Sequence, residues 1–355
     1  MKGVHIMKDL IFRIYALFFN FGAKLGVKKN RVGLVSMHNA HFADGLGEVE
    51  HALGDGYEII KAERTALARP FAALKFITAD AFRLGRAKYI FLNDNFMALA
   101  YAKPDSETKI IQLWHGMGAF KKFGFDIDVE PKVRRLEAAQ AGRLTHVACS
   151  SVGVKDIYAG AFGVSSEKVY PVGTPNEDYY FRTPDVKNEK YTILYAPTFR
   201  EDPESDAKIL SHFDAKAVKD ALGDVEILVR LHPQVHTSSM PTGVTDVTDY
   251  PNVNELCAKA DMPITDYSSI CMDFVLQNKP VVFYAFDLDG YKGARDFYFN
   301  YEDYVPGPIA KTSEELVLAI KEARENRSPN YDEFRKFNFD EPEGDATAKL
   351  LEIIL

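Results

Sequence analysis

Apolar runs of strand length alternate with stretches of helical spacing over most of the chain. From Arg31 onward, short runs have the length of buried strands, and between them apolar residues recur with a period near 3.6. The expected strands are 32–36, 88–93, 109–114, 146–150 and 168–172, and the expected helices are 47–53, 66–76, 131–141 and 154–162. Such alternation indicates a parallel sheet covered by helices.

The same alternation restarts after a polar stretch, 182–190, that is typical of a linker. The later strands are expected at 192–196, 226–231, 244–247 and 262–265, and charged helical stretches follow at 313–326 and 334–355. Two such halves predict a two-domain α/β protein with a cleft between the halves. We therefore expect domains at 31–182 and 190–330, and a C-terminal helix within 331–355 that packs back on the first domain.

Residues 1–30 have a different pattern, that of a basic amphipathic helix. Apolar residues recur near helical period, and lysines and arginines supply almost all of the charge. Arg13, Asn20 and Lys24 interrupt the apolar run, which argues against a transmembrane span, and no cleavage site indicates a signal peptide. The segment is expected either to anchor the protein peripherally to the anionic inner leaflet of a membrane, on its cytoplasmic face, or to be an ordinary packing helix.

Composition and charge narrow the class of partner. The 355 residues are 46% hydrophobic and 26% charged, with a formal net charge of -8, which argues against a nucleic-acid binder that works through a basic surface. The three cysteines, Cys149, Cys257 and Cys271, lack any metal-ligand spacing, so we expect buried thiols, a reducing compartment and no structural zinc.

The stretch from Met262 to Tyr284 combines a strand, a turn, a helix and a second strand, and its turn has the chemistry of a phosphate site. Ser268 and Ser269 lie where the helix begins, so their hydroxyls can join the unpaired N–H groups of the first turn around an anion. Asp273, one turn later, would repel phosphate and is better suited to accept hydrogen bonds from a neutral polyol or ribose. The alternative is that Ser268 only caps the helix and Asp273 favours its first turn.

Further motifs follow expected strands, where ligands bind in open α/β sheets. His115 lies in the run Trp114–His115–Gly116–Met117–Gly118 and suits a general base for a hydroxyl nucleophile, or else is a structural histidine. Arg230 and His232 would share one face of a strand, where Arg230 would bind phosphate oxygens and His232 would donate a hydrogen bond or a proton to the leaving phosphate. The alternative is that Arg230 pairs with an aspartate and His232 only ends the strand. Other candidates are Pro197, Thr198 and Arg200 in one turn and Asn176 in another.

Together, WHG, APTFR, RLHP and TDYSS with a following aspartate resemble the CDP-glycerol glycerophosphotransferase family of wall teichoic acid and capsule synthesis. The resemblance covers roughly Val32 to Ala319. It implies a GT-B fold of two Rossmann-like domains facing a cleft, with the nucleotide mainly in the second. It also implies transfer of glycerol phosphate, or ribitol phosphate, from a CDP-activated donor to a hydroxyl of a lipid-linked or polyol-phosphate acceptor, with release of CMP.

Transferred position by position, the resemblance makes His115 the base that activates the acceptor hydroxyl. It implies that Pro197, Thr198, Arg230 and His232 contact the nucleotide and diphosphate, Ser268 and Ser269 the phosphates, and Asp273 the glycerol or ribose hydroxyls. The chain departs from the family where GxPRND-like runs become GTPNED, so that Asn176 replaces an arginine, and where Met117–Gly118 replaces Thr-Pro. These departures affect the expected substrate more than the reaction class.

Two other functions remain open from the sequence. A GT-B glycosyltransferase that uses a nucleotide sugar would share the phosphate-binding turn, and a non-catalytic membrane-associated protein would only bind nucleotide or polymer. No DxD motif follows a strand convincingly, because Asp126–Ile127–Asp128 lies in a loop and Asp287–Leu288–Asp289 is expected in a solvated turn. We therefore expect no tightly bound metal or cofactor, with CDP-glycerol or CDP-ribitol as a substrate.

Overall fold

A computed structural model describes residues 2–37, 42, 44–184, 186, 188–200, 203–232, 235, 240–291, 296–326 and 329–355, without the side chains of residues 2–7, 203–205 and 207. The chain divides into two compact units. The first comprises residues 1–117, 123–179 and 342–355, and the second comprises residues 118–122 and 180–341. The C-terminal region expected as one segment, 331–355, is therefore split between the units.

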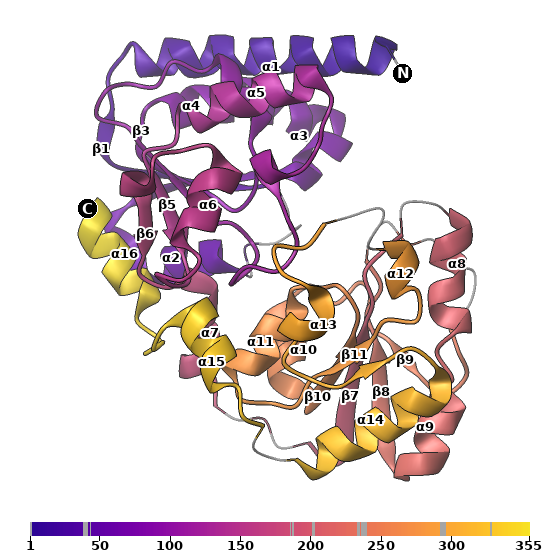
Figure 1. Ribbon diagram of the computed structural model, residues 1–355. Helices are drawn as coiled ribbons and strands as arrows, with labels where there is room; N and C mark the ends of the chain where they lie inside the picture. The colour runs from indigo at the N-terminus through magenta and orange to yellow at the C-terminus, as the bar shows by residue number, and fades with distance from the viewer. Residues whose placement is uncertain are drawn as a thin grey trace. The chain divides into compact units, whose positions relative to one another are not determined.

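The first unit is built on a six-stranded parallel sheet in the order β2-β1-β3-β4-β5-β6 (Figure 1). Its strands are β1 Lys28–Ser36, β2 Glu58–Glu63, β3 Ala87–Leu92, β4 Lys109–Gln112, β5 His146–Cys149 and β6 Val169–Pro171. Its α-helices are α1 Lys2–Ala23, α2 Gly45–Leu53, α3 Pro70–Lys75, α4 Ala81–Gly85, α5 Pro131–Ala141, α6 Lys155–Phe162, the start of α7 Pro175–Arg182, and α16 Ala346–Ile354. The boundary between the units falls within α7, after Tyr179. The alternation of strands and helices in the sequence produces the parallel sheet that was predicted.

The helix α16 covers one face of this sheet together with α2. Leu350 and Ile354 pack with α2 residues and with inward-facing residues of β1, β3 and β4 in one apolar cluster. Asp178, on α7, accepts hydrogen bonds from the backbone N–H groups of Ala346 and Thr347, at 2.9 and 2.8 Å. This carboxylate satisfies two of the unpaired donors at the start of α16 and so fixes the helix to the first unit.

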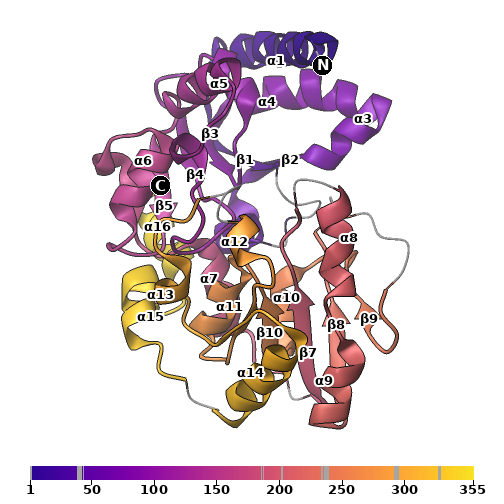
Figure 2. The same ribbon diagram turned by 45° about the vertical axis from the view of Figure 1, so that its right-hand side comes forward.

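The helix α1 lies against α4, along one side of the first unit (Figures 1 and 2). Tyr15 and Phe19 are buried, whereas Leu10, Leu17 and Phe21 are 56%, 67% and 58% exposed. A Cβ atom on Gly85 would lie 2.0 Å from the backbone oxygen of Phe19, so a glycine is needed for this close approach. Among the described residues, no helix has the length and apolar character needed to cross a membrane.

The second unit has a second six-stranded parallel sheet, in the order β12-β11-β10-β7-β8-β9 (Figure 2). Its strands are β7 Tyr191–Ala196, β8 Val225–Val229, β9 Thr245–Asp246, β10 Met262–Thr265, β11 Val282–Tyr284 and β12 Ile309–Ala310. Its α-helices are α8 Pro203–Ser211, α9 Ala215–Leu222, α10 Val253–Lys259, α11 Ile270–Leu276, α12 Leu288–Tyr291, α13 Tyr301–Tyr304, α14 Ser313–Glu325 and α15 Asp332–Phe339. Inward residues of the sheet pack with α8, α9 and α14 in one core.

Several expected elements differ in the structure. The helix expected at 66–76 is broken into the 3-10 segment Arg64–Ala68, α3, and the π segment Phe76–Asp80, because Pro70 begins a new helix and Arg69 before it is extended. The helical stretch expected at 334–355 is interrupted after Phe339, where Asp340 has a φ of 52°. The edge strand β2 was not predicted.

Candidate active site

His115 follows the end of β4, and its ring has a defined orientation. Its Nδ1 lies 3.1 Å from the backbone oxygen of Asn93. A carbonyl oxygen can only accept, so Nδ1 carries the proton that it donates, and Nε2 is then the proton acceptor of the neutral ring. This is the tautomer that a general base requires.

The side chain of Asn93 is buried, at 1% exposure, and organises the chain around His115. Its Nδ2 donates to Ser36 Oγ at 3.1 Å and to Asp44 Oδ2 at 2.7 Å, and its Oδ1 accepts from the N–H of Met37 at 3.0 Å. Asp44 is the N-cap of α2 and also accepts from the N–H of Leu46. One amide therefore joins the end of β1, the start of α2 and the carbonyl that orients the histidine.

Trp114 has the left-handed backbone conformation, with a φ of 62°. This conformation is unfavourable for a bulky residue and persists only where the surroundings impose it. The indole ring stacks on Phe123 with centroids 4.9 Å apart, and Phe162 meets it edge-on at 5.3 Å. The backbone oxygen of Gly116 accepts from Tyr158 Oη at 2.9 Å. The structure thus fixes the residue on each side of His115.

A hollow opens beside His115, within the first unit. It contains about 210 Å³ of space, counting the part open to solvent. It is lined by Gly45, Leu113, Trp114, His115, Gly116, Met117, Thr174, Pro175 and Asn176. The WHG segment and the turn that contains Asn176, distant in sequence, therefore meet at one site.

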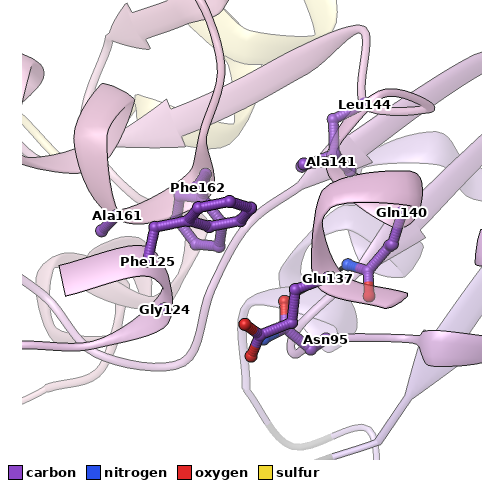
Figure 3. A pocket seen from close by; sticks show the side chains of 9 residues that line it. All are labelled: Asn95, Gly124, Phe125, Glu137, Gln140, Ala141, Leu144, Ala161 and Phe162. Atoms are coloured by element: carbon purple, nitrogen blue, oxygen red, sulfur yellow. Dashed lines mark hydrogen bonds between the residues drawn. The ribbon is translucent and has the colours of Figure 1, made fainter. Parts of the chain in front are cut away.

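The first unit contains a second hollow, which is lined by other residues (Figure 3). Polar side chains, Asn95, Glu137 and Gln140, line one part of it, and the rings of Phe125 and Phe162 line another. Burial raises the pKa of Glu137, despite a hydrogen bond from Arg134. No residue expected at the active site lines this hollow, so the hollow beside His115 is the better candidate for the chemistry.

In the second unit, Arg200 has a buried guanidinium between two carboxylates. Its side chain is 5% exposed and lies 2.9 Å from Asp266 Oδ2 and 2.6 Å from Asp287 Oδ2. The rings of Tyr267 and Tyr291 lie 5.1 and 5.3 Å from its Cζ. The guanidinium of Arg200 was expected to be exposed in its turn as a substrate-binding candidate, but its pairing with two carboxylates buries it against the turn Asp266–Ser269.

Asp287 is a residue whose role the sequence analysis missed. It was expected in a solvated turn, but it pairs with Arg200 and accepts a hydrogen bond from Tyr267 Oη at 2.9 Å. Asp266 in turn accepts from the N–H of Thr198 at 2.8 Å. Pro197 is buried beside Thr198, whose Oγ1 is buried without a partner among the described residues. No local signal indicated the pairing of Arg200 with Asp287, because it joins positions 87 residues apart.

Arg230 and His232 follow β8, which ends at Val229 rather than continuing to residue 231. The Nη1 of Arg230 donates to the backbone oxygen of Tyr250 at 2.8 Å, and to those of Val247 and Thr248. The ring of His232 lies 4.5 Å from that of Phe199. Both side chains are partly exposed, while Pro233, which completes the RLHP motif, lies outside the described residues.

Ser268, Ser269 and Asp273 lie at the start of α11. The Oγ of Ser268 accepts from the N–H of Ile270, the first residue of α11, at 3.3 Å, whereas the N-cap position is Ser269, whose side chain makes no capping hydrogen bond. Asp273 Oδ1 accepts from Tyr180 Oη at 2.7 Å. Burial raises the pKa of Asp273 to about 7, and the bond from Tyr180 opposes that shift. This carboxyl is therefore partly protonated near neutral pH.

The expected site residues are divided between the two units. The first unit holds Trp114, His115, Gly116, Met117 and Asn176, and the second holds Gly118, Pro197, Thr198, Arg200, Arg230, His232, Ser268, Ser269 and Asp273. Gly118 has a φ of 63°, and a Cβ there would lie 2.5 Å from Asn338 Oδ1. Within the described part of the chain, no three His, Cys, Asp or Glu side chains are grouped to hold a metal.

The family comparison matches most of the chain. Residues 62–355 match the model of CDP-glycerol:poly(glycerophosphate) glycerophosphotransferases. The teichoic acid poly(ribitol-phosphate) polymerase of Bacillus spizizenii is 32% identical over 80% of this chain and 49% of its own length. The teichoic acid ribitol-phosphate primase of the same organism is 30% identical over 80% of this chain and 78% of its own. The chain thus spans about half the length of that polymerase and most of the length of the primase.

Solved structures support the fold. A variant of the wall teichoic acid polymerase TagF superposes with a TM-score of 0.81 at 21% identity, over 98% of this chain and 94% of the TagF chain. A UDP-GlcNAc 2-epimerase from Neisseria meningitidis has a TM-score of 0.55 at 12% identity, over 91% of this chain and 99% of its own. The fold is thus a GT-B-like pair of parallel sheets, and the chain belongs to the CDP-glycerol:poly(glycerophosphate) glycerophosphotransferase family.

Proposed function

We propose that this protein transfers a polyol phosphate from a CDP-activated donor to a hydroxyl of a polyol-containing acceptor, with release of CMP. The observation that carries the proposal is the orientation of His115. Its Nδ1 is bound to the carbonyl of Asn93 and its ring borders a hollow of the first unit. In a chain of this family, an imidazole whose Nε2 is the proton acceptor suits activation of a hydroxyl.

The proposed step transfers one proton and exchanges one P–O bond. Nε2 of His115 takes the proton of the acceptor hydroxyl as that oxygen bonds to the phosphorus nearer the polyol. The bond from this phosphorus to the bridging oxygen of the diphosphate breaks in line, and CMP leaves with the bonding electrons. Imidazolium then returns its proton to solvent.

The second unit supplies the groups proposed to bind the donor. Charge develops on the diphosphate as CMP leaves, and oriented donors that stabilise it provide most of the catalysis in phosphoryl transfer. We assign this role to Arg230, His232, Ser268 and Ser269, with Pro197 and Thr198 beside the nucleotide. Asp273, whose pKa is about 7, is suited to bind neutral hydroxyls of the polyol or ribose.

The identity of the polyol rests on the relatives. A teichoic acid glycerol-phosphate transferase of Staphylococcus aureus is 29% identical over 84% of this chain and 85% of its own length. The two Bacillus spizizenii relatives described above carry ribitol phosphate in their names, a third relative from that organism is named a teichoic acid glycerol-phosphate primase, and one TagF structure was soaked with CDPG. CDP-glycerol and CDP-ribitol are therefore the donors to test, with a lipid-linked or polymeric polyol phosphate as acceptor and without a tightly bound metal.

We also propose that α1 holds the protein to the anionic cytoplasmic surface of a bacterial membrane. The row Leu10, Leu17 and Phe21 is exposed, while Tyr15 and Phe19, in a second row, are buried in the first unit. Lys24 and Lys29 are also exposed near the end of α1. An apolar row with flanking cations is the pattern of an interfacial helix, and the buried Tyr15 and Phe19 also support packing of α1 against the first unit.

The test is nucleotide release from CDP-glycerol, CDP-ribitol, UDP-glucose and UDP-N-acetylglucosamine, with and without a short polyol-phosphate acceptor. We expect acceptor-dependent CMP from one CDP-polyol, and a loss of about 10²–10⁴-fold in kcat for His115→Ala, because the general base is removed. Release of UDP from a sugar donor would assign the protein to the glycosyltransferases. No turnover of any donor would favour a protein that only binds nucleotide or polymer.

A further inference from the structure

The hollow beside His115 has an apolar part and a small set of polar groups. Leu113 and Met117 are buried in its wall, and Trp114 adds an aromatic ring. The polar side chains in the lining are those of His115, Thr174 and Asn176, and no Lys, Arg, Asp or Glu is among the lining residues. Such a surface suits a short neutral segment with carbon atoms and hydroxyls, because a charged group would find no opposite charge in the lining.

Thr174 is the residue of this hollow whose hydrogen bonding is incomplete. It is 3% exposed, and its Oγ1 is buried without a hydrogen-bond partner among the described residues. A threonine directly before a helix ordinarily accepts an N–H of the first turn through its hydroxyl. Here Pro175 has no N–H, and the N–H of Glu177 donates to the backbone oxygen of Thr174 instead. A buried hydroxyl without a hydrogen-bond partner is unfavourable, so it is typical of a position that a ligand completes.

The surroundings of Thr174 leave space beside its turn and add little charge. A Cβ on Gly45 would lie 3.3 Å from the backbone nitrogen of Asn176, so the absence of a side chain there leaves room beside the turn. Glu177, one turn into α7, is 2% exposed, and burial raises its pKa to about 8. At neutral pH its carboxyl is therefore mostly protonated and does not add a negative charge behind the hollow.

We propose that this hollow binds the end of the acceptor, and that Thr174 forms a hydrogen bond with the hydroxyl next to the one that His115 activates. The inference rests on the proposed polyol-phosphate transfer and specifies the acceptor as a chain that ends in a vicinal diol. The carbon atoms of that diol lie against Leu113 and Met117, and Asn176 provides a second polar contact. Neither the sequence motifs nor the family comparison assigned a role to Thr174.

The experiment compares two acceptors that differ in one hydroxyl. One is a short glycerol phosphate oligomer ending in glycerol, and the other is the same oligomer ending in propane-1,3-diol, which keeps the reacting hydroxyl and lacks its neighbour. For the wild-type protein we expect kcat/KM to be about tenfold higher for the glycerol end, the effect of one buried hydrogen bond. Thr174→Val should bring the ratio close to one, and Thr174→Ser should retain the preference.

Calorimetric binding of the two oligomers to the full chain, without donor, separates this inference from the proposed function. If CMP is never released but the glycerol-ended oligomer binds about tenfold more tightly, the hollow is an acceptor subsite and the proposed reaction is wrong. The inference is overturned if the wild-type protein does not distinguish the two oligomers, that is, if the ratio of their kcat/KM values, or of their affinities where there is no turnover, is near one. This test does not depend on whether Thr174→Val folds. The inference is also overturned if Thr174→Val shows the same preference for the glycerol end as the wild-type protein, because the Thr174 hydroxyl then does not bind the acceptor.

Discussion

Nδ1 of His115 lies 3.1 Å from the backbone oxygen of Asn93, and the side chain of the same asparagine binds Ser36, Met37 and Asp44. The residue that orients the proposed base is thus itself fixed by three hydrogen bonds to the end of β1 and the N-cap of α2. Because a base must be held within hydrogen-bond reach of the proton that it removes, the rigidity of Asn93 bears directly on catalysis.

Asn93→Ala should reduce both stability and catalysis. The substitution leaves the buried carboxylate of Asp44 and the partly buried N–H of Met37 without their partner, which should lower the free energy of unfolding by about 1–3 kcal/mol. We expect kcat to fall about tenfold and its dependence on pH to change, because the carbonyl that fixes Nδ1 moves. Urea unfolding and the pH profile of kcat measure the two effects.

Ser36→Ala is the matched control, because it removes one hydrogen bond of the same amide and leaves the other two in place. It should cost about 1 kcal/mol of stability and leave the pH profile as in the wild type. Identical kcat and pH profiles for Asn93→Ala and the wild type would show that Asn93 does not position His115.

Arg200 is expected to stabilise the second unit rather than only to contact the proposed donor. Arg200→Met leaves the carboxylates of Asp266 and Asp287 without their cation, and breaking a buried pair in this way costs about 3–5 kcal/mol. The urea midpoint should fall accordingly, and KM for the CDP donor should rise because the turn that carries Ser268 and Ser269 loses its support.

Lys216→Met provides the comparison for Arg200. Lys216 pairs with Asp220 at the surface, with side chains 82% and 63% exposed, and such pairs contribute about 0–1 kcal/mol. If Arg200→Met destabilised the protein no more than Lys216→Met while KM rose, a direct contact with the donor would be the better account.

The dependence of stability on pH should reveal the protonated state of Glu177. Its pKa is raised to about 8 by burial, so the folded protein retains a proton that the unfolded chain releases above about pH 4.5. Unfolding therefore becomes easier as pH rises from 5 to 8, and this one group can lower the free energy of unfolding by up to about 4 kcal/mol over that range.

Glu177→Gln keeps the shape and removes the titration, so the variant should gain stability relative to the wild type between pH 5 and pH 8. Urea unfolding at several pH values measures the difference. Glu352→Gln, on an exposed residue of α16, is the control and should leave the curve unchanged. Parallel curves for Glu177→Gln and the wild type would mean that Glu177 is ionised in the folded protein. Asp273, whose pKa is raised to about 7, contributes in the same direction in both proteins.

The sequence predicted the order of the longer strands and the motifs that follow them, because buried parallel strands are short apolar runs whose ends bear the polar residues. Two of the predicted helices were too long, and the sequence contains a local signal for each break. Pro70 marks the break in the helix expected at 66–76, and Pro342 and Gly344 mark the break in the stretch expected at 334–355. The edge strand β2 reads EIIKAE and lacks the continuous apolar run of the inner strands.

The contacts that shape the site were beyond sequence reasoning for a different reason. Asn93 with Asp44 and Arg200 with Asp287 join residues 49 and 87 positions apart, and no periodic pattern encodes which strand ends meet. Thr174 gave no signal either, because its importance lies in a missing hydrogen bond rather than in a motif.

The exposed row of α1 should determine membrane binding. Replacing Leu10, Leu17 and Phe21 together by serine removes three large apolar side chains that are more than half exposed. Full burial of each is worth about 1.5–3 kcal/mol, so partial insertion of three predicts a loss of at least 100-fold in affinity for anionic vesicles. Cosedimentation with phosphatidylglycerol vesicles measures this affinity.

The control replaces three other exposed apolar residues, Leu318, Ile353 and Leu355, which lie on other helices or at the chain end, and binding should persist. Equal loss in both triple variants would mean that general surface hydrophobicity drives binding, whereas unchanged binding of the α1 variant would leave α1 as a packing helix alone.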